Sequence, residues 1–237
     1  MGTFDFFKSN KKDKQDGLYK TYHANGQLKE EGNFKDGKQD GLRKYYHANG
    51  QLWIENYWKE GVQEGLYKYY YQNGQLKNEG YWKDGKPEGL WLTYYENGQL
   101  KQEGNIEQEG LWSTYYKNGQ LKEEGNFKDG KHEGLWKEYD ENGQVKEEGN
   151  FKEGKREGLW KYYHENGQLK EEGSFNALKN KSFSKDGKEG LWKYYHENGQ
   201  LFIEDYWKEG KREGLRKEYD ENGQLKEEGS FKDGEKL

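Results

Sequence analysis

The chain of 237 residues contains no cysteine and a single proline, Pro87, and it has no apolar run long enough to cross a membrane. Without cysteine the chain forms neither disulfides nor thiolate metal sites, and it has no thiol nucleophile. Aliphatic residues are also scarce, since only 29% of the chain is hydrophobic and the mean hydropathy is −1.57. Such a composition can fill a thin core, but hardly a thick sandwich or a helical bundle.

Aromatic residues, by contrast, are abundant. A charged fraction of 36% would by itself suggest disorder, but 9 Trp, 21 Tyr and 10 Phe contradict that interpretation. The 40 basic and 45 acidic residues are interleaved and leave a net charge of −5. No basic stripe is present for nucleic acid, and attraction to anionic lipid is disfavoured. We therefore expect a folded protein with a thin aromatic core that binds no nucleic acid.

The chain repeats one unit nine times. Asn-Gly-Gln recurs in steps of 24 residues, except for one step of 21 and one of 32, and begins at Asn25, Asn49, Asn73, Asn97, Asn118, Asn142, Asn166, Asn198 and Asn222. A fixed period in this range indicates an array of identical supersecondary units. We predict an N-terminal cap over residues 1–16 and nine repeats over 17–237. The repeats start near residues 17, 41, 65, 89, 110, 134, 158, 190 and 214, and an insertion occupies about 176–183 of the seventh.

Each unit reads as a β-hairpin. In the seventh unit, β-forming residues lie on both sides of Asn166-Gly167, and Asn-Gly between such runs is a strong hairpin signal. A second turn at 152–155 and its equivalents links each hairpin to the next. Glycine recurs too often for helices of useful length. The predicted fold is all-β: an elongated, single-layer antiparallel sheet of about nine tandem hairpins, twisted and curved.

The register of the hairpin decides which residues share a face. A two-residue Asn-Gly loop would pair Tyr163 with Lys170, whereas a three-residue loop would place every constant apolar residue on one face, including Phe175. We favour the three-residue loop, because a slip by one residue exchanges the two faces. Its predicted pairs are Tyr163–Leu169, Lys161–Glu171 and Leu159–Gly173.

The opposite face then carries a more variable row of aromatic residues, interrupted by Arg43 and Arg216. Large aromatic side chains are favoured at binding hot spots, so the row is a candidate partner-binding surface. A purely structural role, covering the glycine-rich sheet, is the alternative. The candidate residues are Tyr67, Trp91, Trp112, Trp136, Trp160, Trp192, Tyr162 and Tyr194.

The sequence contains no pattern typical of an active site, and we expect no enzyme. Four histidines share one repeat position, but equivalent positions lie two strands apart, about 9.6 Å, which is too far for shared zinc ligation. The histidines and the repeated Glu-Glu pairs are interpreted as solvated. No phosphate loop, dinucleotide fingerprint, calcium loop or nucleophile elbow is present. We predict no catalytic residue, no cofactor and no metal site.

Two further features leave alternatives open. The second and eighth repeats share an apolar pair, Trp53-Ile54 and Phe202-Ile203, where most others have Lys-Glu; this indicates either extra packing or an interface. The first ten residues lack the basic start and apolar stretch of a signal peptide. The compartment therefore stays open between the cytoplasm and export after removal of a leader.

The unit G-L-W-x-x-Y-x-x-N-G-Q-L-x-x-x-G-x-F/W resembles the MORN repeat variant found in bacterial proteins, often labelled YwqK-family antitoxins. The resemblance covers about Gly17 to Gly234, with Leu where the eukaryotic form often has Tyr. It implies elongated single-layer sheets and protein–protein scaffolding, with membrane-lipid binding also proposed. The antitoxin label implies binding and neutralising a partner toxin. The family has no residue motif for these functions that can be transferred to this chain.

The expected function is a non-enzymatic scaffold that binds a partner protein, in an antitoxin-like manner. The alternative is a cell-wall or carbohydrate-binding module that uses the Trp/Tyr row, because short aromatic hairpins with glycine turns also occur in choline-binding repeats.

Overall fold

The structure, a computed structural model, describes residues 16–107, 109–177 and 187–237. The chain divides into two compact units, Met1–Gly98 and Gln99–Leu237, and each is described by itself. The predicted N-terminal cap, apart from its last residue, and most of the predicted insertion at 176–183 lie outside the described residues. No helix in the described ranges is long and apolar enough to span a membrane.

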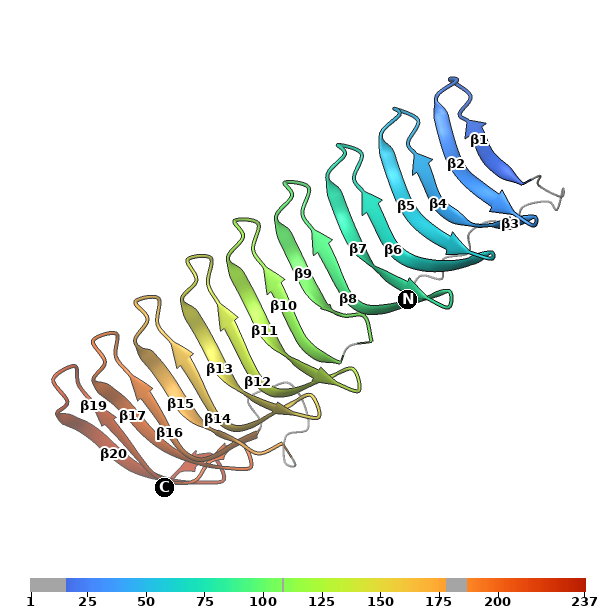
Figure 1. The fold of residues 1–237 in the computed structure, drawn as a ribbon. Helices are drawn as coiled ribbons and strands as arrows, with labels where there is room; N and C mark the ends of the chain where they lie inside the picture. Colours follow the sequence, from blue (N-terminus) through green and yellow to red (C-terminus); the bar gives the residue numbers. More distant parts are fainter. Residues whose placement is uncertain (1–15, 108, 178–186) are drawn as a thin grey trace. The chain divides into compact units, whose positions relative to one another are not determined.

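The first unit is built from β-strands (Figure 1). They are β1 (Gly17–Tyr22), β2 (Leu28–Lys35), β3 (Lys38–Gln39), β4 (Gly41–Tyr46), β5 (Leu52–Lys59), β6 (Val62–Tyr70), β7 (Leu76–Lys83) and β8 (Lys86–Tyr94).

The second unit continues the pattern. Its strands are β9 (Leu100–Asn105), β10 (Gly110–Tyr115), β11 (Leu121–Lys128), β12 (Lys131–Tyr139), β13 (Val145–Lys152), β14 (Lys155–Tyr163), β15 (Leu169–Phe175), β16 (Lys188–Tyr195), β17 (Leu201–Lys208), β18 (Lys211–Arg212), β19 (Gly214–Tyr219), β20 (Leu225–Lys232) and β21 (Glu235–Lys236).

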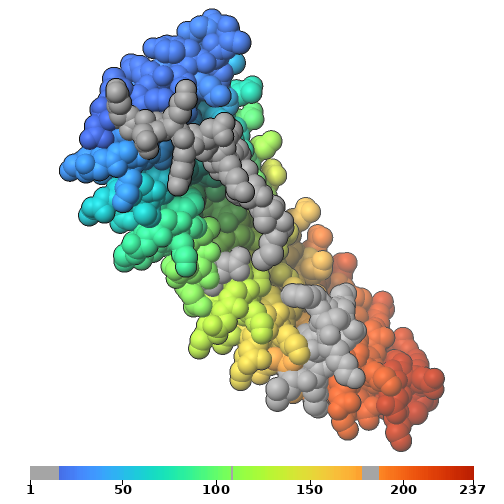
Figure 2. Space-filling view, turned by 90° about the vertical axis from the view of Figure 1, so that its right-hand side faces the viewer, coloured from blue at the N-terminus to red at the C-terminus, as the bar shows by residue number. Residues whose placement is uncertain are grey.

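Within each unit, successive strands pair antiparallel as tandem hairpins in a single layer, which confirms the predicted fold class (Figure 1). In the second unit the space-filling view shows the repeats following one another in chain order, from green to red (Figure 2). Each hairpin therefore packs against its sequence neighbours, as in other repeat arrays.

The Asn-Gly-Gln tip recurs because its asparagine bonds in two directions. The backbone N–H of Gln168 donates to Oδ1 of Asn166 at 3.0 Å, while Nδ2 of Asn166 donates to the carbonyl oxygen of Glu197 in the next repeat at 2.8 Å. Gly167 has φ 81°, a left-handed conformation that favours glycine. The tip thus closes its own hairpin and bonds to the following one.

The second turn is a two-residue type I′ turn. Glu153 and Gly154 have φ values of 49° and 78°, the positive pair that this turn requires. The backbone N–H of Glu153 donates to Oε2 of Glu133, in the preceding repeat, at 2.8 Å. In most repeats the acidic residue before the Gly-Leu pair stabilises the turn of the following unit in this way.

The observed register differs from the predicted one by a β-bulge. Tyr163 pairs with Leu169 as predicted, but Tyr162 pairs with Glu171, so that Lys170 is an extra residue on its strand. The predicted pairs Lys161–Glu171 and Leu159–Gly173 are wrong. The observed pairs are Lys161–Glu172, Trp160–Gly173 and Leu159–Ser174. A bulge inserts one residue and shifts the register beyond it.

This shift changes which residues share a face. Trp160 and Phe175 lie together on one side of the sheet, the aromatic face, with ring centroids 6.3 Å apart. Leu159 lies on the other side, the leucine face, and is 49% exposed. The prediction that the constant Leu, Tyr and Phe positions share one face is therefore wrong for the phenylalanine.

The core of the second unit lies on the aromatic face. Its buried residues are Trp136, Trp160, Phe175 and Trp192. Trp160 and Trp192 each meet the phenylalanine of the preceding repeat edge to face, with ring centroids 5.0 Å from those of Phe151 and Phe175. Such aromatic pairs contribute about 0.5–1.5 kcal/mol beyond the area that they bury.

Candidate functional site

The structure places the predicted partner-binding row on the aromatic face. Trp160 and Trp192 are completely buried and Trp136 is 8% exposed. The rest of the row is half-buried: Tyr67, Trp91, Trp112, Tyr162 and Tyr194. Partner binding by this row stays a prediction, and burial gives its three central tryptophans a role in packing.

Each tryptophan that directly follows a Gly-Leu pair lies over a glycine of the preceding repeat. A Cβ on Gly149 would lie 2.3 Å from Cδ2 of Trp160, and a Cβ on Gly173 would lie 2.2 Å from Cδ2 of Trp192. Neither glycine has a positive φ, so space for the indole explains it better than backbone conformation.

Two repeats replace this glycine where the next repeat has no tryptophan. Asn56 pairs with Tyr67 across β5 and β6. Asp205, which is 1% exposed, lies 3.7 Å from Nε of Arg216 and accepts a hydrogen bond from Nε of Arg212 at 3.0 Å. The residue at this glycine position thus changes together with the residue that the next repeat places opposite it, and this relationship is visible in the sequence. One repeat departs from it, because Gly32 lies opposite Arg43.

Cations cover two of the buried tryptophans of the second unit, Trp160 and Trp192. The guanidinium carbon of Arg156 lies 4.3 Å from the Trp160 ring centroid, and Nζ of Lys188 lies 3.6 Å from that of Trp192. The side chain of Lys188 is 5% exposed, and a cation–π contact desolvated in this way contributes about 2 kcal/mol. These cations occupy one repeat position, two residues before the Gly-Leu pair, and were not predicted from the sequence.

Tyrosine and carboxylate groups hold these cations in place. Arg156 donates to the hydroxyl of Tyr162 at 2.6 Å and to Glu147 at 3.0 Å. Burial raises the pKa of Tyr162, and burial also raises the pKa of Glu147 against the opposing charge of Arg156. In the next repeat Lys188 donates to the hydroxyl of Tyr194 at 2.9 Å. The two cations that cover Trp160 and Trp192 therefore have hydrogen-bond partners on the same face of the sheet.

The histidines at the shared repeat position connect successive hairpins. Nε2 of His164 lies 2.9 Å from the carbonyl oxygen of Tyr195, and Nε2 of His23 lies 2.9 Å from that of Tyr46. The sequence predicted solvated histidines beside the loops, and the structure shows them half-buried. Among the described residues, no cluster of His, Asp and Glu side chains could hold a metal ion.

The leucine face exposes the constant leucine of most repeats. The most exposed members are Leu18 (66%), Leu90 (58%), Leu111 (60%), Leu135 (51%), Leu159 (49%) and Leu215 (41%). In the second unit most of these leucines lie opposite a polar residue: Asn126, Asn150, Ser174 or Ser230.

The first unit has tyrosines at two of these polar positions. Tyr57 pairs with Leu42 and Tyr81 pairs with Leu66; the two tyrosines are 41% and 59% exposed. Together with Leu90 on β8 they are here named the tyrosine–leucine stripe, which crosses five consecutive strands. Tyr81 itself pairs with Glu88 rather than with Leu90.

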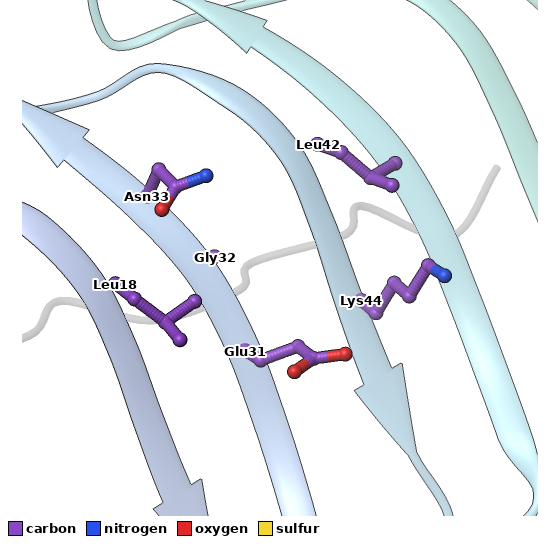
Figure 3. A pocket seen from close by; sticks show the side chains of 6 residues that line it. All are labelled: Leu18, Glu31, Gly32, Asn33, Leu42 and Lys44. Carbon is purple, nitrogen blue, oxygen red and sulfur yellow. The ribbon is translucent and has the colours of Figure 1, made fainter.

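Ion pairs flank this stripe on the leucine face. Nζ of Lys44 lies 3.6 Å from Glu55, and Nζ of Lys68 lies 3.9 Å from Glu79. A shallow hollow adjoins the Leu42 end and is lined by Leu18, Glu31, Gly32, Asn33, Leu42 and Lys44 (Figure 3). The face therefore offers apolar contact beside a row of paired charges.

Comparison with solved structures gives weak similarity. The chain is similar to the crystal structures of TcdB2-TccC3-Cdc42 (13% identity, TM-score 0.22) and TcdB2-TccC3-TEV (13%, 0.23), and to the Photorhabdus luminescens Tc holotoxin pore with a TccC3 mutation (12%, 0.20). These matches cover 90% of this chain but only 13%, 14% and 14% of those chains. TM-scores this low carry no argument. No curated protein matches this chain.

The family comparison covers most of the chain. The model described as MORN repeat variant matches nine segments: 15–36, 39–60, 63–84, 87–107, 108–129, 133–153, 156–177, 188–209 and 212–233. The matched segments follow the hairpin period seen in both units. The chain therefore belongs to the MORN repeat variant family.

Proposed function

We propose that the protein is a scaffold that holds a partner protein on its leucine face. MORN repeats are generally linked to protein- or membrane-binding scaffolds and form a non-enzymatic family. The proposal uses the protein-binding side of that general role, because the leucine face is apolar and its flanking charges are paired.

The row of exposed leucines carries the proposal. Leu111, Leu135 and Leu159 occupy the same repeat position, and about half or more of each side chain is exposed. Fully burying a leucine side chain is worth about 1.5–3 kcal/mol, so a partner that covers several of them gains substantial free energy. The aromatic face offers less, since its central tryptophans are already covered.

The burial also bears on the carbohydrate alternative. A sugar-binding platform needs an exposed aromatic ring, and Trp160 and Trp192 have no exposed surface. We therefore place the binding function on the leucine face rather than on the Trp/Tyr row.

The antitoxin-like form of this function is a narrower proposal. It says that the bound partner is a toxin whose activity is blocked, and only the resemblance of the repeat unit supports it. Co-expression with toxins encoded beside this chain tests it: rescue of growth by the wild type, but not by a leucine-face variant, is the expected result.

A triple variant tests the scaffold itself. Leu111→Thr, Leu135→Thr and Leu159→Thr together remove apolar surface but keep β-forming residues. Affinity capture from host extract, quantified by mass spectrometry, should lose the partners that the wild type retains. The matched control is Asn126→Ser, Asn150→Ser and Ser174→Asn on the same face. Equal recovery by a folded triple variant would overturn the proposal.

A further inference from the structure

We propose that the tyrosine–leucine stripe of the first unit binds a proline-rich segment of a partner protein in the polyproline II conformation. The inference rests on the proposed scaffold function and names the chemistry of one partner. The stripe consists of Leu42, Tyr57, Leu66, Tyr81 and Leu90 on β4 to β8.

The stripe is continuous from β4 to β7. Leu42 and Tyr57 are directly paired, as are Leu66 and Tyr81. Between these pairs, a Cβ on Gly65 would lie 3.5 Å from Cβ of Tyr57, so no side chain separates β5 from β6 at this level. From Leu42 to Tyr81 a ligand that crosses the strands therefore meets a row of apolar groups. On β8 the residue opposite Tyr81 is Glu88, two residues before Leu90, and its carboxylate pairs with Lys83.

The spacing of the two tyrosines selects the ligand conformation. Tyr57 and Tyr81 lie two strands apart, which is about 9.6 Å at the usual strand spacing. One turn of a polyproline II helix, three residues, advances about 9.3 Å. Two α-helical turns advance about 10.8 Å, and same-face residues of an extended strand recur every ~6.7 Å. Polyproline II gives the smallest mismatch.

The tyrosine hydroxyls suit the backbone of such a ligand. Among the described residues, neither Tyr57 nor Tyr81 has a side-chain hydrogen-bond partner for its hydroxyl. The carbonyl groups of a polyproline II segment make no internal hydrogen bonds, so they can accept from these hydroxyls while the proline rings contact the phenol faces. Proline-rich segments bind aromatic-lined surfaces in this way.

The size and charge of the stripe argue against other occupants. Its exposed apolar area is on the order of 400 Å², the size of a functional patch on a monomer but about half of what each partner buries in a standard interface. A second copy of this sheet would need more area. The lysines Lys44 and Lys68 on its flank are paired with Glu55 and Glu79, so these two cations are not available to attract an anionic membrane.

Direct titration with peptide probes tests the proposal. Three fluorescein-labelled dodecapeptides serve as probes: one of Pro-Pro-Leu repeats, one amphipathic Leu/Glu/Lys helix and one of Gly-Ser repeats. Fluorescence polarisation with the full chain should show saturable binding of the proline-rich probe only. Preferred binding of the helical probe, or no binding of the proline-rich probe, would overturn the inference.

Substitutions locate the binding site. Tyr57→Asn together with Tyr81→Asn should lower the affinity for the proline-rich probe about tenfold or more, which is the usual effect of losing hot-spot side chains. Asparagine already occupies this position at Asn33, so the double variant is compatible with the repeat. The control Tyr206→Asn removes a lone tyrosine, 49% exposed on β17, and should leave affinity unchanged. Unchanged binding by the folded double variant would contradict the proposal.

A gain-of-function variant tests the proposal even if the double asparagine variant fails to fold. Asn126 on β11 and Asn150 on β13 also lie two strands apart, beside Leu111 and Leu135. Asn126→Tyr with Asn150→Tyr should raise the stoichiometry from one probe to two per chain, and a stoichiometry of one would count against the spacing argument. Partner loss from the Leu111/Leu135/Leu159 variant is independent of these titrations, so failure of the scaffold role and failure of the ligand assignment are distinguishable.

Discussion

Gly149 and Trp160 fit together so closely that a Cβ on the glycine would lie 2.3 Å from Cδ2 of the indole. The contact joins β13 to β14 and recurs between Gly173 and Trp192. One repeat thus supplies the space into which the next repeat inserts its largest side chain. Removing that space should separate adjacent hairpins.

The first prediction concerns Gly149. Gly149→Asn should destabilise the second unit by about 1–3 kcal/mol, because the new side chain overpacks the site. Adding Trp160→Tyr should recover part of the loss, since Asn56 lies opposite Tyr67 in the first unit. Urea unfolding followed by tryptophan fluorescence measures the cycle. If Gly149→Asn is as stable as the wild type, the surrounding residues accommodate the added side chain without loss of stability.

The second prediction separates the two faces at adjacent residues. Trp160 is completely buried and Leu159 is 49% exposed. Trp160→Ala should cost about 3–5 kcal/mol, the usual loss for a buried aromatic residue, whereas Leu159→Ala should cost about 1 kcal/mol or less. Thermal unfolding of both variants provides the measurement. Equal losses would contradict the observed register and favour the register expected from the sequence.

The third prediction concerns the pair Asp205 and Arg216, which replaces the glycine–tryptophan contact. Arg216→Trp alone should destabilise the chain by about 3 kcal/mol, because the indole meets the buried carboxylate and Asp205 loses a counter-charge. Adding Asp205→Gly should restore most of the stability by recreating the arrangement of Gly149 and Trp160. Chemical denaturation gives the free energy of unfolding of both variants. If the double variant is no more stable than Arg216→Trp alone, the Asp–Arg pair cannot be replaced by a glycine–tryptophan contact at this site.

The fourth prediction is a pH dependence. The hydroxyl of Tyr163 donates to Glu148 at 2.8 Å, and burial, followed by this carboxylate, raises the pKa of Tyr163 from 10.0 to about 12. A raised pKa in the folded state means that the protonated hydroxyl stabilises folding. This stabilisation is complete below pH 10.0, the ordinary value, and is lost as the pH rises to about 12.

Tyr163→Phe should therefore lose less stability than the wild type between pH 10.0 and about 12. Tyr22→Phe serves as the control, because Tyr22 is 61% exposed at the first repeat. Urea midpoints at stepped pH values measure the difference. Parallel curves for the wild type and Tyr163→Phe would exclude the coupling.

Much of the fold could be predicted because the repeat aligns with itself. The Asn-Gly tip around Gly167 and the Glu-Gly turn at Gly154 are local signals, so both turns were predictable without tertiary information. Pairing of Tyr163 with Leu169 also follows from the tip. The next pair was not predictable in this way, because the bulge at Lys170 satisfies packing on both faces rather than a local propensity.

The candidate surface was predictable only in part. The sequence shows that the Trp160 position and the Leu159 position differ, but a one-residue change of register exchanges their environments. The covering cations were also missed, since Arg156 reads as a solvated charge in sequence. Its contacts with Trp160 and Glu147 exist only once neighbouring strands are in register.

The sequence by itself determined that this protein is an array of hairpins, because turn chemistry and repeat period are local properties of the chain. Only the tertiary structure decided which face of the sheet is buried and which is exposed. Phe175 joins Trp160 in the core and Leu159 is left exposed, because one bulged residue per hairpin reverses the alternation of side chains beyond it.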